Sequence, residues 1–296
     1  MARFLHVFLV RYGMFSEDRT LSHGSLAVRA LCSFVVLLSI PAGTAFAATD
    51  GVGGPSPTAQ ASSSSLPEAP PPQPEESLRC TPVRVLKDQG AIWTSPLRIR
   101  PHDLLWLAPL AAATGAAIAT DRRAIVSEIS HDPSFNQANI NASNVMIGGL
   151  IAAPVVWLGA GYLREDEHAR ETGILGGEAI LDGLVLEQGM KLIFWRERPT
   201  VDGARGRFFQ SSAGVDSSFP SSHSVLAWSS AAVIAGEYPS PWVQLGVYSV
   251  AAGVSVTRVL GQEHFPSDVL VGSAAGWLVG HYVYKVHHRH RRGVDH

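Results

Sequence analysis

The sequence contains few charged residues, and neither sign of charge is in clear excess. Charged side chains make up 16% of the 296 residues, whereas soluble domains contain roughly 25%. A balance of 23 Lys and Arg against 25 Asp and Glu excludes a basic nucleic-acid-binding protein, and the scarcity of charge excludes a coiled coil. With 46% hydrophobic residues, the chain is also too apolar to be disordered throughout. Its mean hydropathy of +0.13 fits both a membrane protein and a soluble helical bundle rich in alanine and glycine.

Cysteine is equally scarce, since the sequence holds two, Cys32 and Cys80. Two cysteines are too few for a disulfide framework or for a zinc site built from thiolates. We therefore expect the chemistry of this chain to depend on other side chains.

The N-terminal segment has the pattern of an export signal. Four arginines and only two acids precede residues 30–42, which are uncharged and apolar, and an A-x-A site follows that ends at Ala47. We interpret residues 1–47 as a signal peptide or an uncleaved anchor, with translation starting at Met1 or at Met14.

The next segment, residues 48–79, is rich in proline, serine and glycine and almost free of aliphatic side chains. Such a segment cannot bury enough apolar surface to offset its loss of conformational entropy, so we predict a disordered tether. The folded helical domain is expected over residues 80–287. Residues 288–296 form a basic tail, and we interpret the histidines near it as solvated rather than as a site.

Beyond the tether, polar turns separate apolar blocks that are too long for ordinary strands. Closely spaced alanines and glycines within them favour close helix packing. We predict an all-α bundle of about six helices with the active site at one end. The blocks are Leu104–Thr120, Val145–Leu163, Thr172–Phe194, Ser222–Gly236, Pro241–Val259 and Ser267–Val286.

The lengths of these blocks leave membrane insertion open. Uncharged windows of 17, 20, 20 and 16 residues compare with the roughly 20 residues needed to span a bilayer. The third block carries Glu178, Asp182, Glu187 and Lys191, each costing roughly 2.5–3.5 kcal/mol at the centre of a spanning helix. Glu178 and Asp182, one turn apart, are expected to face the bundle interior; the alternative is a helix half-exposed to water. We favour membrane embedding.

Lys191 and Arg198 are seven residues apart, which on a helix returns them to nearly the same face. Pro199 is predicted to stop that helix directly after them. Two aligned cations at a helix end can bind an anion, and the planar fork of Arg198 suits phosphate-like oxygens. Taken alone, such a pair more often complements the helix dipole.

The segment from Phe219 to His223 opens the next apolar block. With Ser221 or Ser222 at the helix start, unpaired backbone N–H groups are free to face an anion. His223 in the first turn is suitably placed to donate a proton to a leaving oxygen. The competing interpretation is a capped helix with a surface histidine.

Arg258, His264 and Asp268 form a third group around the turn between the last two blocks. A carboxylate one helical turn after His264 can hold one ring nitrogen and leave the other as a nucleophile. Lone His–Asp pairs are usually structural, but Arg258 lies six residues upstream on an otherwise apolar segment.

Antiparallel packing of consecutive helices would bring all three groups to one end of the bundle. The combined set suits a phosphate-like oxyanion held beside a nucleophile and an acid. It depends on no metal, and no other cluster has metal-ligand spacing, so we expect neither a metal nor a cofactor. The predicted catalytic residues are His264, His223 and Asp268, and the predicted phosphate-binding residues are Lys191, Arg198, Ser221, Ser222 and Arg258.

With these residues in place, the chain resembles the type-2 phosphatidic acid phosphatase (PAP2) / vanadium haloperoxidase superfamily over roughly residues 170–285. The family pattern is K-x6-R-P, then P-S-G-H, then S-R-x5-H-x3-D. Here the first part is complete, Ser222 replaces the glycine of the second, and Thr257 replaces the serine of the third. The matching segments are Lys191-LIFWRE-Arg198-Pro199, Pro220-Ser221-Ser222-His223 and Thr257-Arg258-VLGQE-His264-FPS-Asp268.

The resemblance implies roles for these residues. His264, oriented by Asp268, would attack phosphorus to give a phosphohistidine, and His223 would protonate the departing alkoxide. The phosphoryl oxygens would be held by a group of four side chains and by a backbone N–H at the position of Ser222. That group is Lys191, Arg198, Ser221 and Arg258.

Four functions follow as hypotheses. The leading one is a metal-independent phosphatase that hydrolyses phosphomonoesters or diphosphates, favoured as those of lipids because the helices are so apolar. The alternatives are a vanadate-dependent haloperoxidase, a soluble periplasmic acid phosphatase acting on small phosphate esters, and an inactive lipid-binding membrane scaffold. The expected partners are a phosphorylated lipid or small ester and the membrane, with no nucleic acid; the substrate and the oligomeric state stay undecided.

Charge also bears on location. The basic tail, which begins near Lys285, favours a cytoplasmic C-terminus, and the other end of the last block would then face outward with the site. We expect a cell-membrane (inner-membrane) protein with an extracytoplasmic site, the alternative being a soluble periplasmic protein. Six membrane spans with a cytoplasmic C-terminus would place residues 80–103 in the cytoplasm, whereas a cleaved signal peptide would place them outside. The sequence does not decide between these two arrangements.

Overall fold

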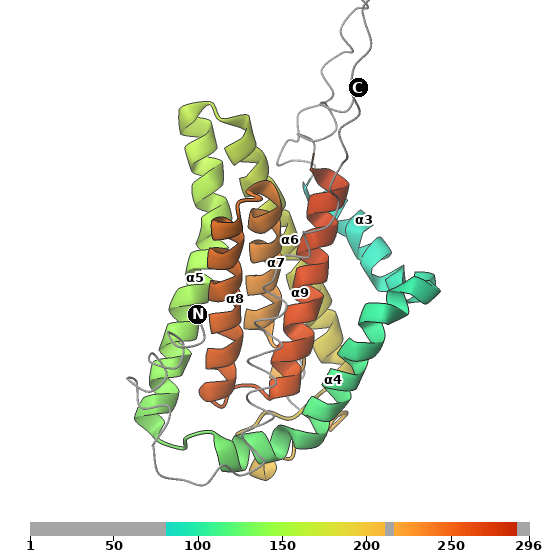
Figure 1. The fold of residues 1–296 in the computed structure, drawn as a ribbon, viewed down its shortest axis with the longest axis vertical. Helices are drawn as coiled ribbons and strands as arrows, with labels where there is room; N and C mark the ends of the chain where they lie inside the picture. The colour runs from blue at the N-terminus through green and yellow to red at the C-terminus, as the bar shows by residue number, and fades with distance from the viewer. Residues whose placement is uncertain (1–80, 211–215, 289–296) are drawn as a thin grey trace, which may run out of the picture.

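The computed structural model describes residues 81–210 and 216–288. Within them the fold is an all-α bundle, as predicted, and contains seven α-helices (Figure 1). The signal-like segment, the tether and the end of the basic tail lie outside the described residues. The helices are α3 (Thr81–Thr94), α4 (Leu104–Arg123), α5 (Pro133–Arg164), α6 (Glu167–Phe194), α7 (Ser222–Glu237), α8 (Pro241–Leu260) and α9 (Pro266–His287).

All six apolar blocks form helices, and α3 is an additional helix that the block pattern did not identify. The helix starts have local causes. Asp166 accepts a hydrogen bond from the backbone of Ala169 at 3.1 Å and caps α6. Pro241 and Pro266 occupy the first turns of α8 and α9, where the missing proline N–H costs nothing.

Helix α7 is the centre of the bundle and packs most extensively against α9. Glycine makes this close approach possible. A Cβ at Gly276 would lie 2.2 Å from the carbonyl oxygen of Val225, and one at Gly280 would lie 2.2 Å from that of Ser229. The predicted close packing through small residues is therefore confirmed for this pair of helices.

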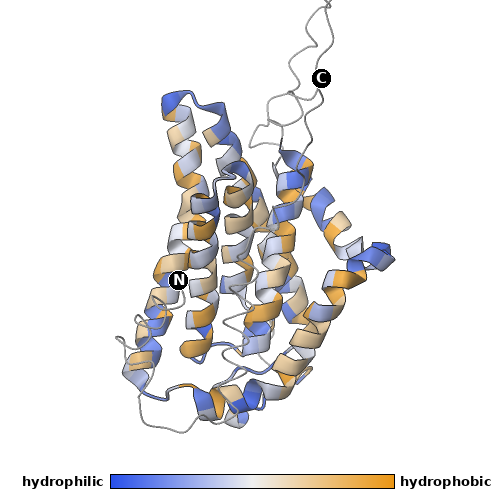
Figure 2. Ribbon diagram, viewed as in Figure 1, coloured by the Kyte–Doolittle hydropathy of each residue, from blue (hydrophilic) through white to orange (hydrophobic). Residues whose placement is uncertain are grey.

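Three segments among the described residues are long and apolar enough to cross a membrane: Pro101–Glu128, Pro133–Arg164 and Pro241–Leu260. Figure 2 shows apolar residues along the helices and hydrophilic residues gathered toward the ends of the bundle. In α6, Glu178 and Asp182 are fully buried, which confirms that they face the interior.

Candidate active site

The end of α6, the start of α7, the end of α8 and the start of α9 meet at one end of the bundle (Figure 1). This convergence is what antiparallel packing of consecutive helices predicts. We call this region the phosphate end, defined by Lys191, Arg198, His223, Arg258 and His264.

The predicted helical alignment of Lys191 and Arg198 is wrong. Helix α6 ends at Phe194, where Trp195 takes a left-handed conformation with φ of 38°, so Arg198 lies beyond the helix and Pro199 does not stop it. Arg198 still reaches the phosphate end, because its guanidinium pairs with Glu263 at 3.2 Å.

Lys191 is buried and held by two neighbours. Its Nζ lies 2.8 Å from Glu187 Oε1 and donates to Ser222 Oγ at 2.8 Å. The Ser222 hydroxyl in turn donates to Glu187 Oε1 at 2.5 Å. The serine that stands in place of the family's glycine therefore links α7 to the lysine and the carboxylate of α6.

Ser221 is the N-cap of α7, and Ser222 is the first helical residue. The backbone N–H of Ser221 donates to the carbonyl of Asp268 at 3.1 Å, which fastens α7 to α9. The Ser221 hydroxyl is buried and has no hydrogen-bond partner among the described residues. Together with the first N–H groups of α7, it offers donors suited to an anion.

His223 lies at the start of α7, outside the three candidate membrane spans. Its Nε2 is 3.1 Å from Oδ1 of Asn144 on α5. Burial, together with the positive charges of Arg258, His264, Lys191 and Arg198, lowers the pKa of His223 from 6.5 to about 3. An anion bound among these cations would oppose that effect and raise the pKa.

His264 is fully buried in the turn before α9, and its ring is held differently from the prediction. Nδ1 lies 2.8 Å from the backbone carbonyl of Ser218, whereas Asp268 Oδ2 is 3.6 Å away. The direct hydrogen bond therefore goes to Ser218, and Asp268 is a second neighbour of the ring. Burial lowers the pKa of His264 and Asp268 partly offsets this, so the neutral imidazole is favoured.

Asp268 is held by a buried network that the sequence analysis missed. Its Oδ1 accepts from Arg196 at 2.5 Å, and its Oδ2 accepts from the Ser218 hydroxyl and, at 2.9 Å, from the backbone N–H of Phe265. Arg196 is 1% exposed and also pairs with Asp121 of α4 at 2.6 Å. Two buried carboxylates thus share one guanidinium.

Arg258 and Arg198 approach the same carboxylate from different segments. Glu263 Oε2 lies 3.1 Å from Arg258 and 3.2 Å from Arg198. Arg258 Nε is buried and unpartnered among the described residues. Glu263 therefore bridges two guanidiniums next to His264, at a point where an incoming anion would compete with it.

The sequence offered weak signals for these additional residues. Arg196 lies inside the K-x6-R-P segment and Glu263 directly precedes His264, so both could have been examined as neighbours of motif residues. Asp121 lies 75 residues before Arg196, and no spacing rule links the two.

Taken together, the phosphate end brings one lysine, two arginines, two histidines and the unpartnered donors Ser221 Oγ and Arg258 Nε to one place. Nδ1 of His264 faces a carbonyl, which leaves Nε2 as the nitrogen available for attack. Such an arrangement can bind an oxyanion and present a nucleophile to it.

Comparison with known proteins identifies relatives of this region. Residues 173–292 match the family model described as PAP2 superfamily. A curated relative, the "Lipid A 1-phosphatase" of Porphyromonas gingivalis, is 34% identical over 110 residues, which is 36% of this chain and 22% of that protein. The chain thus spans about a fifth of the length of this relative, and no solved structure matches it. Residues 173–292 are therefore similar to the PAP2 superfamily.

Proposed function

We propose that this protein is a lipid phosphatase that works through a phosphohistidine. The observation that carries the proposal is the juxtaposition of buried, neutral His264 with Lys191, Arg198 and Arg258 at one end of the bundle. The match of residues 173–292 to the PAP2 superfamily and the similarity to a lipid A 1-phosphatase support this class of reaction.

In the proposed first step, Nε2 of His264 attacks phosphorus while the bond from phosphorus to the leaving oxygen breaks. His223 gives its proton to that oxygen. The pKa of His223 is low without an anion, so the bound phosphoryl group has to raise it for this role. The Ser218 carbonyl holds Nδ1–H of His264, and Asp268 stabilises the positive charge that develops on the ring.

In the second step, a water molecule attacks the phosphohistidine and the N–P bond breaks. His223, now neutral, accepts the proton of the water, and inorganic phosphate leaves. Lys191, Arg198 and Arg258 stabilise the phosphoryl oxygens in both steps, with the Ser221 hydroxyl and the first N–H groups of α7 as further donors.

An apolar cavity near the phosphate end supports a lipid substrate. It has a volume of about 710 Å³ and lies among α3, α4, α6 and α9. One of its lining residues, Phe194, packs on Phe219 with ring centroids 5.0 Å apart, directly before the Pro220-Ser221 segment. We propose that the cavity takes acyl chains of the substrate.

The test of the function is phosphate release by the purified full chain in detergent. Lipid A, phosphatidate and a polyprenyl diphosphate are compared with p-nitrophenyl phosphate, and bromide oxidation with added vanadate tests for haloperoxidase activity. We expect lipid turnover that His264→Ala lowers by at least ~10³-fold, with ³²P trapped on the wild-type chain in rapid-quench experiments. His102→Ala, which removes an exposed histidine, is the control. Undiminished turnover by His264→Ala, or bromination without phosphate release, would overturn the proposal.

We also propose that the protein lies in the inner membrane with the phosphate end outside the cytoplasm. The three candidate spans and the basic residues that follow Tyr284 support this orientation. Single cysteines at Asp202, on the phosphate end, and Arg164, on the opposite end, are introduced into a chain in which Cys32 and Cys80 are serine. A membrane-impermeant maleimide should label position 202 in intact cells and position 164 only after lysis; the reverse pattern would contradict the orientation.

A further inference from the structure

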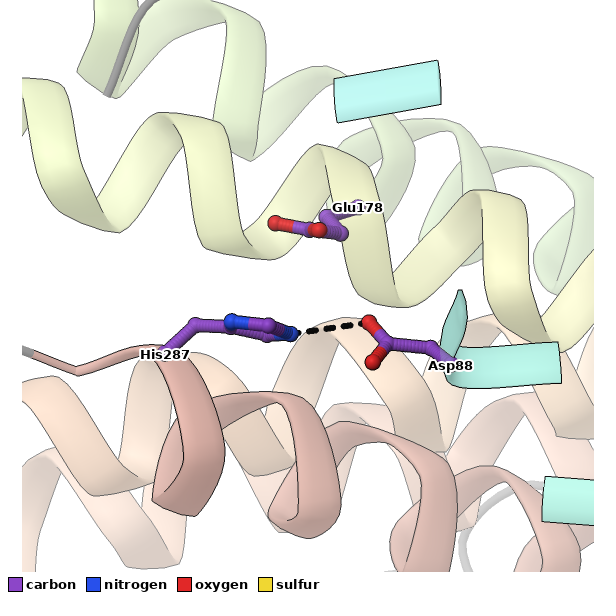
Figure 3. A group of neighbouring side chains, drawn as sticks. All are labelled: Asp88, Glu178 and His287. Carbon is purple, nitrogen blue, oxygen red and sulfur yellow. Dashed lines mark hydrogen bonds and ion pairs between the residues drawn. The ribbon is translucent and has the colours of Figure 1, made fainter. Parts of the chain in front are cut away.

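A second polar cluster lies among three helices, away from the phosphate end. Asp88 of α3, Glu178 of α6 and His287 of α9 each offer one ligand atom, and these atoms all lie within 4.8 Å of one another. Figure 3 shows the Glu178 carboxylate facing the pair formed by His287 and Asp88. Glu178 is 0% exposed and Asp88 is 3% exposed, so the cluster is shielded from water.

The carboxylates of this cluster are incompletely satisfied. Glu178 Oε1 accepts from Arg84 at 2.8 Å, but Glu178 Oε2 is buried without a hydrogen-bond partner among the described residues. Oδ2 of Asp182, one helical turn further along α6, is also buried without a hydrogen-bond partner among the described residues. Buried carboxylate oxygens without partners are costly, and a bound cation would supply what they need.

The geometry of the cluster is close to that of a metal site. Asp88 Oδ2 and His287 Nε2 are 2.9 Å apart, while ligand atoms at about 2.1 Å from one zinc ion lie ~3.4 Å apart in tetrahedral geometry. The third ligand atom, from Glu178, lies within 4.8 Å of both of these atoms. The hydroxyl of Tyr282 donates to the other oxygen of Asp88 at 3.1 Å, as outer partners of metal ligands commonly do.

We propose that Asp88, Glu178 and His287 bind a first-row divalent cation, Zn²⁺ by the chemistry of the ligands, and that the ion ties α3 and α9 to α6. One imidazole and two carboxylates suit zinc better than magnesium or calcium, which prefer oxygen ligands alone. The site is separate from the phosphate end, because Glu178 precedes Lys191 by thirteen residues of α6, or about 20 Å along the helix. Its role is structural.

Two of the histidines near the basic tail, His287 and His288, are held by carboxylates and are not solvated as the sequence analysis expected, whereas His290 and His296 lie outside the described residues. His287 pairs with Asp88, and His288 lies 2.8 Å from Glu237. Sequence spacing could not identify the proposed ligands, since they come from three helices that are far apart in the chain.

A neighbouring group provides a matched control. Glu171, Glu237 and His288 also place ligand atoms within 4.8 Å of one another. Both carboxylate oxygens of Glu237 are engaged, however, one with His288 at 2.8 Å and the other with His168 at 3.0 Å. The group therefore lacks the unpartnered oxygen that distinguishes the Glu178 cluster.

The experiment is a Co²⁺ titration of the purified full chain in detergent at pH 8, after chelation and dialysis, because imidazole binds metal ions in its deprotonated form. We expect one Co²⁺ per chain with visible absorption bands, displacement by Zn²⁺, and a Tm several degrees higher with Zn²⁺ than without it. Asp88→Asn and Glu178→Gln should each weaken binding at least about tenfold, whereas Glu237→Gln should bind as the wild type does.

Circular dichroism identifies the variants that fold, and the two isosteric substitutions give independent readings. Absence of saturable binding by the wild type would overturn the proposal. So would unchanged Co²⁺ spectra in both Asp88→Asn and Glu178→Gln, or loss of binding in Glu237→Gln alone. These measurements do not depend on phosphatase activity, so they test the metal site independently of the proposed function.

Discussion

The phosphate end and the cluster of Asp88, Glu178 and His287, here called the acidic cluster, have opposite charge, although α6 and α9 contribute to both. Helix α6 carries Glu178 and Asp182 in one region and Lys191 in the other. At the phosphate end the unpartnered buried atoms include two donors, Ser221 Oγ and Arg258 Nε, whereas in and beside the acidic cluster they include two carboxylate oxygens. The bundle therefore buries unpartnered donors in one region and unpartnered acceptors in the other. Because buried polar groups are usually hydrogen-bonded, the first region suits an anion and the second suits a cation.

The largest effect on stability is expected from Arg196→Ala. This change leaves the buried carboxylates Asp121 and Asp268 facing each other without their shared cation. Breaking such a buried pair costs about 3–5 kcal/mol, and kcat should fall as well because Asp268 lies beside His264. The measurement is denaturant unfolding in detergent together with lipid phosphatase assays.

Arg205→Ala is the control for this prediction, since Arg205 is exposed and its nearest carboxylate, that of Asp202, is 3.7 Å away. We expect it to change stability by less than ~0.5 kcal/mol. If Arg196→Ala lowered the free energy of unfolding no more than the control does, the buried network around Arg196 would not stabilise the phosphate end.

The next effect in size concerns anion affinity. Glu263→Gln removes the carboxylate that bridges Arg198 and Arg258, so the two guanidiniums become more available to an anion. We expect the Kd for inorganic phosphate to fall by roughly 5- to 10-fold, or about 1 kcal/mol, measured by calorimetry. Glu197→Gln is the control, because Glu197 pairs with Arg207 and not with these arginines. Weaker binding by Glu263→Gln would mean that Glu263 positions the arginines and does not compete with the anion.

The sequence predicted the phosphate end better than the acidic cluster, for a physical reason. The six apolar blocks and the motif residues lie within the repeating pattern of helix, turn and helix, where spacing determines which ends meet. The residues that complete each region lie in other segments: Asp121 and Asn144 come from α4 and α5, and Asp88 comes from α3. Contacts between distant segments depend on tertiary packing, which periodicity does not encode.

Two details of the site were mispredicted because local geometry overrode spacing. The helical alignment of Lys191 and Arg198 assumed a helix that continues to Pro199, but α6 ends at Phe194. The predicted orientation of His264 by Asp268 assumed that the nearest carboxylate would accept a hydrogen bond from the ring N–H. The backbone carbonyl of Ser218 takes that place instead, and backbone carbonyls leave no signal in a sequence.

The two histidines of the phosphate end are expected to make the stability of the fold depend on pH. The pKa of His223 is lowered to about 3 and that of His264 is also lowered, in both cases mainly by burial. Below pH 6.5 the unfolded chain binds protons that the folded chain does not, so the stability of the fold decreases as the pH falls from 6.5. We expect a contribution of the order of 1 kcal/mol per histidine by pH 5.5.

Thermal unfolding from pH 7.5 to 5.5 measures this dependence. His223→Gln should show a shallower decrease of Tm than the wild type, and saturating phosphate should have a similar effect by raising the pKa of His223. An unchanged slope in His223→Gln would show that its imidazole is not kept neutral by its surroundings.

The smallest effect is expected from Ser222→Gly, which restores the glycine of the family pattern. The substitution removes the hydroxyl that donates to Glu187 and accepts from Lys191, so stability should fall by about 1 kcal/mol. Turnover should stay within about threefold of wild type, because Lys191 keeps its pair with Glu187 at 2.8 Å and the backbone N–H at position 222 is retained. Unfolding and kcat measurements on the same preparation test both parts. A loss of turnover beyond tenfold would show that the serine hydroxyl takes part in the reaction. The expected result limits the role of this hydroxyl to joining α6 and α7. Anion binding at the phosphate end would then depend on the cations and the backbone.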